Sequence, residues 1–376
     1  MVHHTLRDLF IKGKHEVCPY SAALFATLLL AFQSVLHAST IPSDLQRTLV
    51  ASGQGYFPVA LRLQDSRIAV VMRGGGTHLS IHGRLDMVFS SDQGKSWSKP
   101  TVVVDSPLDD RNPALGQAAD GAIVVAFWRT ARYDEQGRYN EKLDKPVNTW
   151  VTRSNDGGKS WSEPQQIDVS DISWGSPYGK MITLPDGAML MSMYGGNSSP
   201  APHSGPGASY LYRSTDNGKT WRRFSTIAGG YNETAIARLA NGDLLAALRS
   251  GKPQDVSVAR SRDGGKNWSV PSVITPANVH PADLLPLADG SVLMTCGYRV
   301  GPTFGVRALL SAADGSFDWK SHFTLVDDAT NRDCGYPSSI LLKDGRVLTV
   351  YYAVGSKEHP DWQTHCGAVM YVAHSP

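Results

Sequence analysis

Short apolar runs that follow tight-turn signals recur along most of this chain. Five of the turns are Asp-Gly or Asn-Gly pairs, and each precedes a run such as AIVVAFW at residues 122–128. These pairs begin at Asp120, Asp186, Asn241, Asp289 and Asp344, and a weaker sixth copy is Asp65-Ser66 before RIAVVM. Asp-Gly and Asn-Gly pairs between apolar runs are a strong short-range signal for a β-hairpin. The pattern therefore predicts six hairpins.

An eight-residue motif, Ser-x-Asp-x-Gly-x-x-Trp, alternates with these hairpins. Its four copies are Ser90–Trp97, Ser154–Trp161, Ser214–Trp221 and Ser261–Trp268, and a longer fifth version is Ser311–Trp319. Asp and Gly favour a tight turn, because Asp accepts hydrogen bonds from nearby N–H groups and Gly tolerates positive φ. The Trp supplies a large apolar anchor. Alternating apolar residues, as in 85–89, place the turn between two strands. We interpret this motif, the Asp-box, as structural rather than catalytic.

The two repeats together predict the architecture. The hairpins recur at intervals of roughly fifty to sixty residues, and most are followed by an Asp-box strand pair. Six four-stranded antiparallel units predict an all-β fold, a six-bladed β-propeller, over residues 45–376. No Asp-box follows the last hairpin, so the first strand of the mature chain is expected to complete the final blade.

The first 38 residues have the pattern of a secretory signal peptide. Lys12 and Lys14 precede an apolar run from Ala22 to Leu36, and Ala38 offers a small residue for cleavage. The run is short for a membrane span. An uncleaved anchor is the alternative, because Leu36 occupies a position where a small residue is preferred. We therefore expect a secreted or periplasmic protein without stable membrane insertion after cleavage.

Composition excludes several classes of partner. The chain of 376 residues carries a formal net charge of +2 and no basic stripe, which argues against nucleic-acid binding. The cysteines of the predicted propeller, Cys296, Cys334 and Cys366, do not have the spacing of a metal site. No Gly-rich phosphate loop is present. We therefore expect no metal and no cofactor, and the sequence carries no signal for an oligomeric state.

Polar and aromatic residues recur at matching positions of the repeats. Counting back from each turn gives the inner-strand starts Phe57, Asn112, Tyr178, Glu233, Pro281 and Tyr336. Counting forward gives the returning ends Arg73, Trp128-Arg129, Tyr194, Arg249, Tyr298-Arg299 and Tyr352. Both sets are expected at one rim of the central funnel, where propellers bind ligands. A rim rich in Arg and Tyr favours an anionic or sugar-like ligand, because Arg forks match carboxylates.

Two segments at this rim resemble the sialidase superfamily of glycoside hydrolases. They are YNETAIARLANGDLLAALR at 231–249 and GYPSSILLKDGRVLTVYY at 335–352, and the wider resemblance extends from about Gly55 to the end. It implies that Tyr336 is the nucleophile, Glu233 its base and Arg249 one of the arginines that hold the substrate carboxylate. A sialic acid carries its carboxylate on the anomeric carbon, so a neutral Tyr suits the reaction better than a carboxylate nucleophile. Either Arg299 or Arg307 would supply a second clamp.

The sequence also departs from this family. Sialidases begin the propeller with Arg-Ile-Pro, whereas this chain has Tyr-Phe-Pro at 56–58, so the first clamp is missing. Their acid/base Asp follows an Arg that matches Arg73, but here Leu79 or Ile81 occupies its position. His82 is a candidate replacement, and His78 is similar, because His exchanges protons near neutral pH. Either could equally be a plain turn residue.

The second repeat offers further candidates. Asp110 and Arg111 begin an inner strand, where Arg111 could replace the missing clamp and Asp110 could be an acid/base. The alternative is an internal salt bridge or a loop cap. Arg73 and Tyr178 are further expected substrate contacts. Inserts at 131–147 and 195–209 are expected either to shape the pocket or to be solvated loops.

Three hypotheses follow. The first is a secreted exo-glycosidase that hydrolyses a terminal sialic acid or related 2-keto acid sugar from glycans. The second is a glycosidase or lyase of the same superfamily that acts on another terminal sugar, such as a uronic acid or rhamnose. The third is a non-catalytic glycan-binding propeller, against which the retention of Glu233 and Tyr336 argues.

Overall fold

The computed structural model describes residues 40–143, 145, 147–172, 174–196, 207–312 and 314–373. The chain divides into two units, Met1–Ala38 and Ser39–Pro376. The predicted signal peptide lies outside the described residues. Within those residues, no helix has the length and apolar character needed to cross a bilayer.

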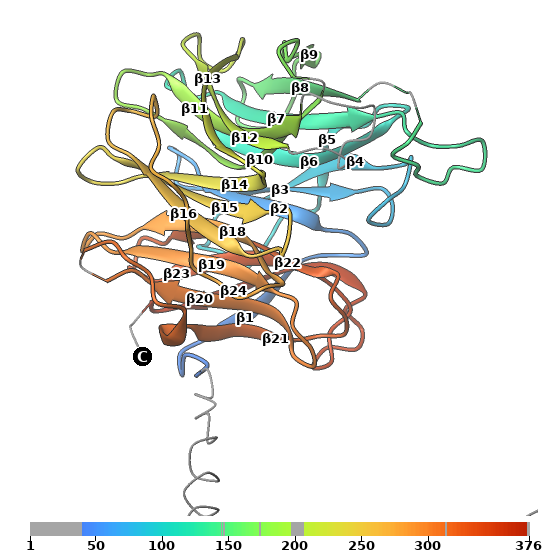
Figure 1. Ribbon diagram of the computed structural model, residues 1–376. Helices are drawn as coiled ribbons and strands as arrows, with labels where there is room; N and C mark the ends of the chain where they lie inside the picture. Colours follow the sequence, from blue (N-terminus) through green and yellow to red (C-terminus); the bar gives the residue numbers. More distant parts are fainter. Residues whose placement is uncertain are drawn as a thin grey trace, which may run out of the picture. The chain divides into compact units, whose positions relative to one another are not determined.

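The second unit is all-β and propeller-like (Figure 1). Its described part contains a single short 3-10 helix, η1, at Trp319–Ser321. Four of its sheets are four-stranded and antiparallel. They comprise β2 (Tyr56–Arg62), β3 (Ile68–Gly74), β4 (Arg84–Ser90) and β5 (Thr101–Val104); β14 (Tyr231–Arg238), β15 (Leu244–Ser250), β16 (Val256–Ser261) and β17 (Ser272–Val273); β18 (Val279–Pro286), β19 (Val292–Tyr298), β20 (Phe304–Leu310) and β21 (Phe323–Ala329); and β22 (Cys334–Leu341), β23 (Val347–Val354), β24 (Thr364–Tyr371) and β1 (Gln46–Ser52).

The remaining sheet has eight strands in the order β13-β12-β11-β10-β6-β7-β8-β9. Its strands are β6 (Asp109–Gln117), β7 (Ile123–Thr130), β8 (Val147–Ser154), β9 (Gln165–Gln166), β10 (Trp174–Thr183), β11 (Met189–Gly196), β12 (Ala208–Ser214) and β13 (Arg222–Gly229). Two antiparallel runs of four strands meet where β10 and β6 pair in parallel. That junction is short and consists of Gly179 opposite Ala114 and Lys180 opposite Leu115.

The Asp-boxes form the turns between the third and fourth strands of their units. In the first box, Ser90 Oγ donates to Asp92 Oδ1 at 2.8 Å and accepts from the Gly94 N–H at 2.8 Å. The hydroxyl and the N–H of Ser96 also donate to Asp92, and these bonds lower the pKa of Asp92 to about 2. The boxes at Ser154, Ser214 and Ser261 repeat this network. The interpretation of the motif as a turn between strands is confirmed.

The glycine of each box also governs how closely adjoining units pack. A Cβ atom on Gly94 would lie 2.1 Å from Leu348 of β23, and one on Gly158 would lie 2.4 Å from Phe89 of β4. Gly265 approaches Leu211 of β12 in the same way. The motif therefore needs Gly for two reasons, the positive φ of the turn and the absence of a side chain at the neighbouring unit.

The N-terminal strand closes the last sheet, as the sequence predicts. β1 pairs with β24 in an antiparallel register from Gln46 opposite Met370 to Ser52 opposite His365. The guanidinium of Arg47 adds a 2.9 Å ion pair to Asp328 in β21. Residues near the two ends of the described chain are thereby held in one sheet.

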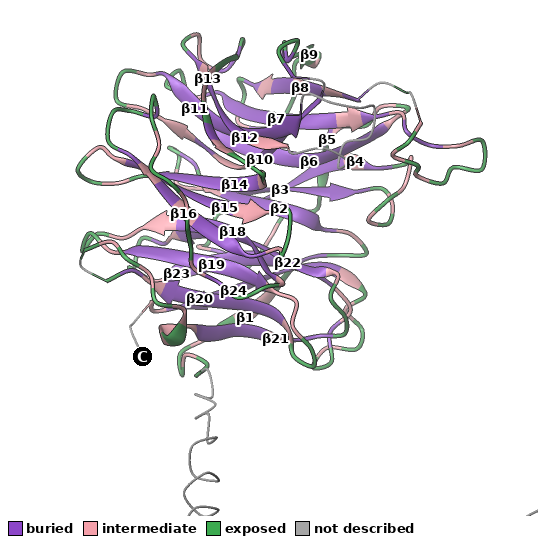
Figure 2. Ribbon diagram, viewed as in Figure 1, coloured by how far each residue is buried: buried purple, intermediate pink, exposed green. Residues whose placement is uncertain are grey.

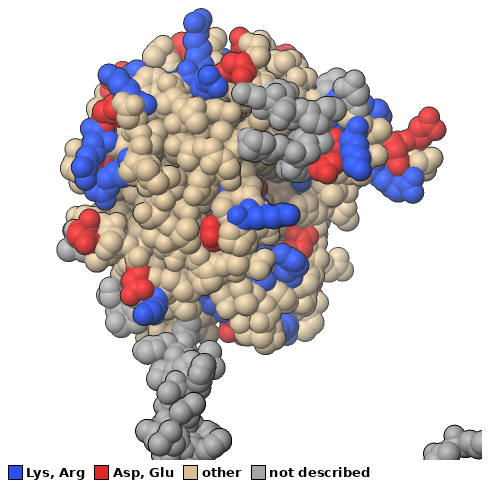
Figure 3. All heavy atoms as spheres, in the orientation of Figure 1, with Lys and Arg blue, Asp and Glu red and all other residues tan. Residues whose placement is uncertain are grey.

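The inner strands β2, β6, β10, β14, β18 and β22 pack against one another in sequence, and β22 packs against β2, so the series closes on itself. These strands are largely buried, whereas loops and the outermost strands β5, β9, β13 and β17 are more exposed (Figure 2). Charged side chains of both signs are interspersed on the face shown in Figure 3.

Replacing Gly265 with Ala should destabilise the protein more than replacing its neighbour Gly264. Both residues have positive φ, 93° and 74°, so Ala is strained by about 1–2 kcal/mol at either position. A Cβ on Gly265 would also lie 2.5 Å from Leu211, whereas nothing lies within 4 Å of one on Gly264. We expect the free energy of unfolding, measured with urea, to fall by about 1–3 kcal/mol more in Gly265→Ala than in Gly264→Ala. Equal losses would contradict a role for this glycine in packing between units.

Candidate active site

The pairing of each inner strand is interrupted, and most of these interruptions contain candidate site residues. The pairing registers skip between Tyr56 and Val59, Arg111 and Ala114, Tyr178 and Ile182, Tyr231 and Thr234, Val279 and Ala282, and Gly335 and Ser338. Phe57, Asn112, Glu233, His280 and Tyr336 all lie in these interruptions. Phe57, Asn112 and Tyr336 have positive φ values of 54°, 50° and 48°. Such strained backbone is concentrated at functional sites in proteins.

Tyr336, Glu233 and Arg249 form one hydrogen-bonded trio. The hydroxyl of Tyr336 donates to Glu233 Oε1, and Nη1 of Arg249 donates to Glu233 Oε2. Burial and the Glu233 carboxylate raise the pKa of Tyr336 above its ordinary value, so its hydroxyl is neutral in the resting protein. Burial opposes the charge on Arg249, but Glu233 and Tyr336 raise its pKa overall. The structure thus brings together the three residues that the sequence assigns to one site.

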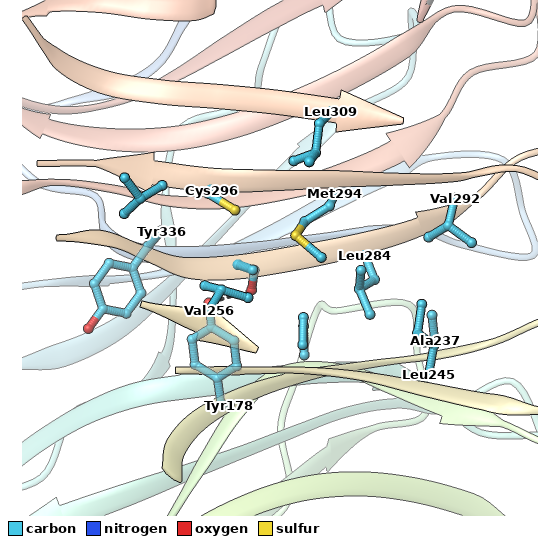
Figure 4. Close-up of a cluster of buried hydrophobic side chains, with 14 of the residues drawn as sticks. Tyr178, Ala237, Leu245, Val256, Leu284, Val292, Met294, Cys296, Leu309 and Tyr336 are labelled. Carbon is cyan, nitrogen blue, oxygen red and sulfur yellow. Dashed lines mark hydrogen bonds between the residues drawn. The ribbon is translucent and has the colours of Figure 1, made fainter. Parts of the chain in front are cut away.

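Aromatic rings surround Tyr336. The Phe57 ring lies 4.8 Å away, and those of Tyr352 and Tyr178 lie 5.7 Å and 6.2 Å away, measured between ring centroids. Tyr336 sits at the edge of a buried apolar cluster, with its hydroxyl directed away from Met294 (Figure 4). The ring is therefore packed on its apolar sides while its hydroxyl faces the polar trio.

Arg299 and Arg307 occupy different surroundings. The guanidinium carbon of Arg299 lies 5.4 Å from the Tyr336 ring centroid, and its Nε and Nη2 donate to the Cys334 carbonyl at 3.2 and 2.9 Å. Arg307 instead stacks 4.1 Å from Tyr298 and donates to the Val326 carbonyl at 2.8 Å. The structure brings Arg299 to the trio and leaves Arg307 between Tyr298 and β21.

A second buried charge cluster centres on Asp109. Arg73 donates to Asp109 Oδ1 at 2.9 and 3.1 Å, and the Tyr133 hydroxyl donates to Oδ2 at 2.6 Å. Arg111 Nη1 lies 3.4 Å from the same carboxylate, and its guanidinium carbon lies 5.7 Å from the Phe57 ring centroid. Arg111 therefore adjoins the rings around Tyr336, whereas Arg73 is fully buried against Asp109. The insert at 131–147 contributes Tyr133 to this cluster.

Two candidates from the sequence lie apart from the trio. Asp110 accepts from Arg129 Nε at 2.6 Å and from the Ser106 N–H at 2.8 Å, which is the salt bridge and loop cap considered as its alternative. Burial raises the pKa of Asp110. His82 is exposed in a turn, where its N–H donates to Ser80 Oγ. Neither residue has a hydrogen bond to Tyr336 or Glu233.

Two polar residues of the site were not singled out as candidates from the sequence. His280 is fully buried, and neither ring nitrogen has a hydrogen-bond partner among the described residues. Burial, with Arg249 and Arg299 nearby, lowers the pKa of His280 to about 2. Asn112 Nδ2 donates to the Tyr194 hydroxyl at 3.0 Å, and its Oδ1 has no described partner. Both residues lie at strand positions close to the one that Glu233 occupies in its own repeat, and this correspondence was the signal in the sequence that could have identified them.

The floor of the site crosses the centre of the inner-strand ring. The Tyr178 hydroxyl donates to the Ala282 carbonyl at 3.0 Å. Lys180 Nζ donates to Asp283 at 2.8 Å and to the Ser339 carbonyl at 2.7 Å. These contacts link β10, β18 and β22. Tyr178 packs near Tyr336 with its ring, and its hydroxyl is bonded to the backbone of β18.

The arrangement can support nucleophilic chemistry beside a bound anion. A neutral Tyr hydroxyl is hydrogen-bonded to a carboxylate that can take its proton, which is the geometry of an activated nucleophile. Arg249 and Arg299 provide positive charge beside it, and Arg249 Nε has no described hydrogen-bond partner. Within the described residues, no three His, Cys, Asp or Glu side chains gather as metal ligands would.

Known proteins share this combination of repeats and fold. The model of the BNR repeat-like domain family matches residues 73–349. A sialidase from Bacteroides fragilis strain YCH46 is 24% identical over 313 residues, which cover 73% of this chain and 54% of that protein. The chain belongs to the BNR repeat-like family of the sialidase superfamily. The resemblance stated from the motifs is thereby confirmed, although the chain spans about half the length of its curated relative.

Solved structures agree on the fold of this BNR-repeat protein. A protein of unknown function from Dyadobacter fermentans has a TM-score of 0.74 and 25% identity, with 88% of this chain and 100% of that chain covered. A variant of the NanB sialidase from Streptococcus pneumoniae has a TM-score of 0.67 and 14% identity, with 85% of this chain and 68% of that chain covered.

His280 should make this BNR-repeat protein sensitive to acid. Its pKa falls from 6.5 to about 2 on folding, so below pH 6.5 the unfolded chain binds a proton that the folded chain does not. The free energy of unfolding should therefore fall with pH in this window, by up to ~1.4 kcal/mol per pH unit from this residue. His280→Phe should flatten the dependence in urea unfolding between pH 6.5 and 4.5. The exposed His82→Phe should leave the slope unchanged, and a His280→Phe slope equal to wild type would contradict the assignment.

Proposed function

We propose that this protein is an exo-acting glycosidase that hydrolyses a terminal sialic acid, or a related 2-keto acid sugar, from glycans. The observation that carries the proposal is the trio in which the Tyr336 hydroxyl and Arg249 bind opposite oxygens of Glu233. The sialidase from Bacteroides fragilis and the NanB sialidase, which share the fold or part of the sequence, support the class of reaction.

The chemistry of the substrate explains why a Tyr would serve as nucleophile. The carboxylate of a 2-keto acid sugar sits on the carbon under attack, and it would repel a carboxylate nucleophile. Burial raises the pKa of Tyr336, which keeps the hydroxyl neutral as the substrate approaches. Glu233 then accepts the phenolic proton as the Tyr oxygen bonds to the anomeric carbon.

Three arginines are proposed to hold the substrate carboxylate. Arg249 binds Glu233, the partner of Tyr336, and Arg299 lies over the Tyr336 ring. Arg111 lies over the Phe57 ring, which contacts Tyr336. Phe57 lies in the Tyr-Phe-Pro segment where related enzymes carry their first arginine, so Arg111 would replace the missing charge from the next strand unit. The Nε atoms of Arg111 and Arg249 are buried without a described partner, which favours an incoming acceptor.

We also infer that the eight-stranded sheet represents two blades, so the propeller has six. The two halves share only the short parallel junction between β10 and β6. A Cβ atom on Gly218, in the Asp-box after β12, would lie 3.1 Å from Val124 of β7. The glycines of the boxes in separate sheets contact their neighbouring sheets in the same manner, which supports counting the halves as separate blades.

The proposed site of action is outside the cytoplasm. This proposal rests on the pattern of the first 38 residues, which predicts a cleaved signal peptide and a secreted or periplasmic product.

Tyr336→Phe should abolish turnover. Removal of the nucleophile should lower kcat by about 10³-fold or more on a fluorogenic sialic acid glycoside. The matched control is Tyr371→Phe, which removes a buried hydroxyl bonded to Thr349 outside the site and should retain wild-type kcat. Full activity in Tyr336→Phe would refute the nucleophile assignment.

The substrate class is tested with the same assay. Release by wild type from a uronide or rhamnoside, with none from the sialoside, would replace the proposed sugar. An unsaturated product detected by ultraviolet absorbance would indicate a lyase. Binding without turnover of any of these glycosides would indicate a glycan-binding protein.

Arg299→Lys should weaken substrate binding more than Arg307→Lys. Lysine lacks the planar fork that binds a carboxylate through two parallel bonds, so KM for the sialoside should rise roughly tenfold or more in Arg299→Lys. Arg307 donates to backbone carbonyl groups of its own sheet, so its replacement should lower thermal stability and leave KM near wild type. The reverse pattern would assign the clamp to Arg307.

A further inference from the structure

A histidine and an aspartate from distant parts of the sequence pair at the rim of the site. His78 lies in the loop between β3 and β4, and Asp333 directly precedes β22, which carries Tyr336. His78 Nδ1 and Asp333 Oδ1 lie 2.8 Å apart. The side chains are 37% and 31% exposed, so the pair is reachable from solvent and yet fixed by contacts.

The pair is held from both sides. The Tyr352 hydroxyl donates to Asp333 Oδ1 at 2.7 Å, and the N–H of Asp333 donates to Asn331 at 2.8 Å. Hydrogen bonds from His78 and Tyr352 lower the pKa of Asp333 against the opposing effect of burial. An aspartate that stays ionised beside an imidazole fixes the orientation of the ring.

Arg73 fixes the loop that carries His78. Its guanidinium, neutralised by Asp109, also donates to the carbonyl groups of Thr77 and Ser80 on either side of His78. Arg73 was expected to contact substrate, but all of its described bonds serve this loop and Asp109. The buried ion pair therefore positions the histidine.

His78 also packs on the rings around Tyr336. The Phe57 ring centroid lies 5.0 Å from that of His78 and 4.8 Å from that of Tyr336, so the two outer rings are at most about 10 Å apart. Glycosidases that act through a covalent intermediate place their two catalytic carboxyl groups about 5–5.5 Å apart, a separation that this upper bound allows.

Other titratable groups of the inner strands are already bonded or stay uncharged. Asp110 is bonded to Arg129, and Asp283 is bonded to Lys180. His280, whose pKa is about 2, remains neutral between two arginines. Among the described histidines, His78 is the one whose Nδ1 lies beside a carboxylate, and its contact with Asp333 leaves Nε2 as the ring nitrogen for proton exchange.

We propose that His78, oriented by Asp333, is the acid/base residue of the site. This inference rests on the proposed function. In the first step, the Tyr336 oxygen bonds to the anomeric carbon and its proton passes to Glu233, while the glycosidic C–O bond breaks and its oxygen takes the proton from His78 Nε2. In the second step, neutral His78 takes a proton from water, the water oxygen bonds to the anomeric carbon, the bond to Tyr336 breaks and Glu233 returns the phenolic proton. The sum is hydrolysis.

A comparison of leaving groups tests this role. An aryl leaving group such as 4-methylumbelliferone departs without protonation, whereas the sugar of an unactivated sialyl-oligosaccharide must be protonated. His78→Ala should therefore lower kcat on the oligosaccharide about 10²–10⁴-fold. On the aryl glycoside, the rate of glycosyl-enzyme formation, measured as the pre-steady-state burst, should fall less than tenfold. Leu79→Ala, an exposed side chain of the same loop, should retain both rates.

The outcomes are separable. The acid/base assignment would be overturned if His78→Ala lost activity equally on both substrates, or if the leaving-group effect appeared in His82→Ala instead. In either case, turnover by the wild-type protein would leave the proposed function intact. Absence of wild-type turnover on the sialoside, uronide and rhamnoside would overturn the proposed function and this inference with it.

Asp333 is a positioning residue, and its variant gives a distinct readout. Asp333→Asn keeps the size of the side chain but removes the carboxylate that orients the His78 ring. We expect kcat on the oligosaccharide to fall with KM nearly unchanged, and the aryl burst rate to be retained. A rise in KM with kcat unchanged would contradict the positioning role and indicate a contact to substrate.

Discussion

The bulge that interrupts every inner strand is the constraint on which the site depends. A regular strand would alternate its side chains between the two faces of a sheet, and none would be aimed along the axis of the ring. The bulges release Phe57, Glu233, His280 and Tyr336 from the ladder at one level. The packed sheets on either side hold the resulting positive φ of Phe57 and Tyr336. Strain at these positions is thus supported by the whole domain.

Buried charge is arranged around this level in two connected clusters. Glu233 is neutralised by Arg249, and Asp109 by Arg73 and Arg111. Burying such pairs costs desolvation energy that their attraction does not always recover, so they are a poor source of stability. Their value here is geometric. The first cluster fixes the Tyr336 hydroxyl against Glu233, and the second fixes the loop that carries His78 and places Arg111 beside Phe57.

The aromatic rings connect the two clusters. Phe57 contacts both His78 and Tyr336, and Tyr352 contacts Tyr336 while its hydroxyl binds Asp333. Rings are stiff and keep water away from their faces, so the Tyr336–Glu233 and His78–Asp333 pairs on either side are held at a set separation. The same packing, through burial, raises the pKa of Tyr336 and keeps its hydroxyl neutral.

The sequence by itself determined the strands, the Asp-box turns, the closure by the N-terminal strand and the meeting of Glu233, Arg249 and Tyr336. These follow from local turn chemistry and from a fixed count along each hairpin, which repeats in every unit. Only the tertiary structure decided that Arg299 rather than Arg307 lies beside Tyr336 and that Asp110 is committed to Arg129. It also joined His78 to Asp333, 255 residues away. Such pairings depend on side-chain direction and on contacts between sheets, which no local pattern encodes.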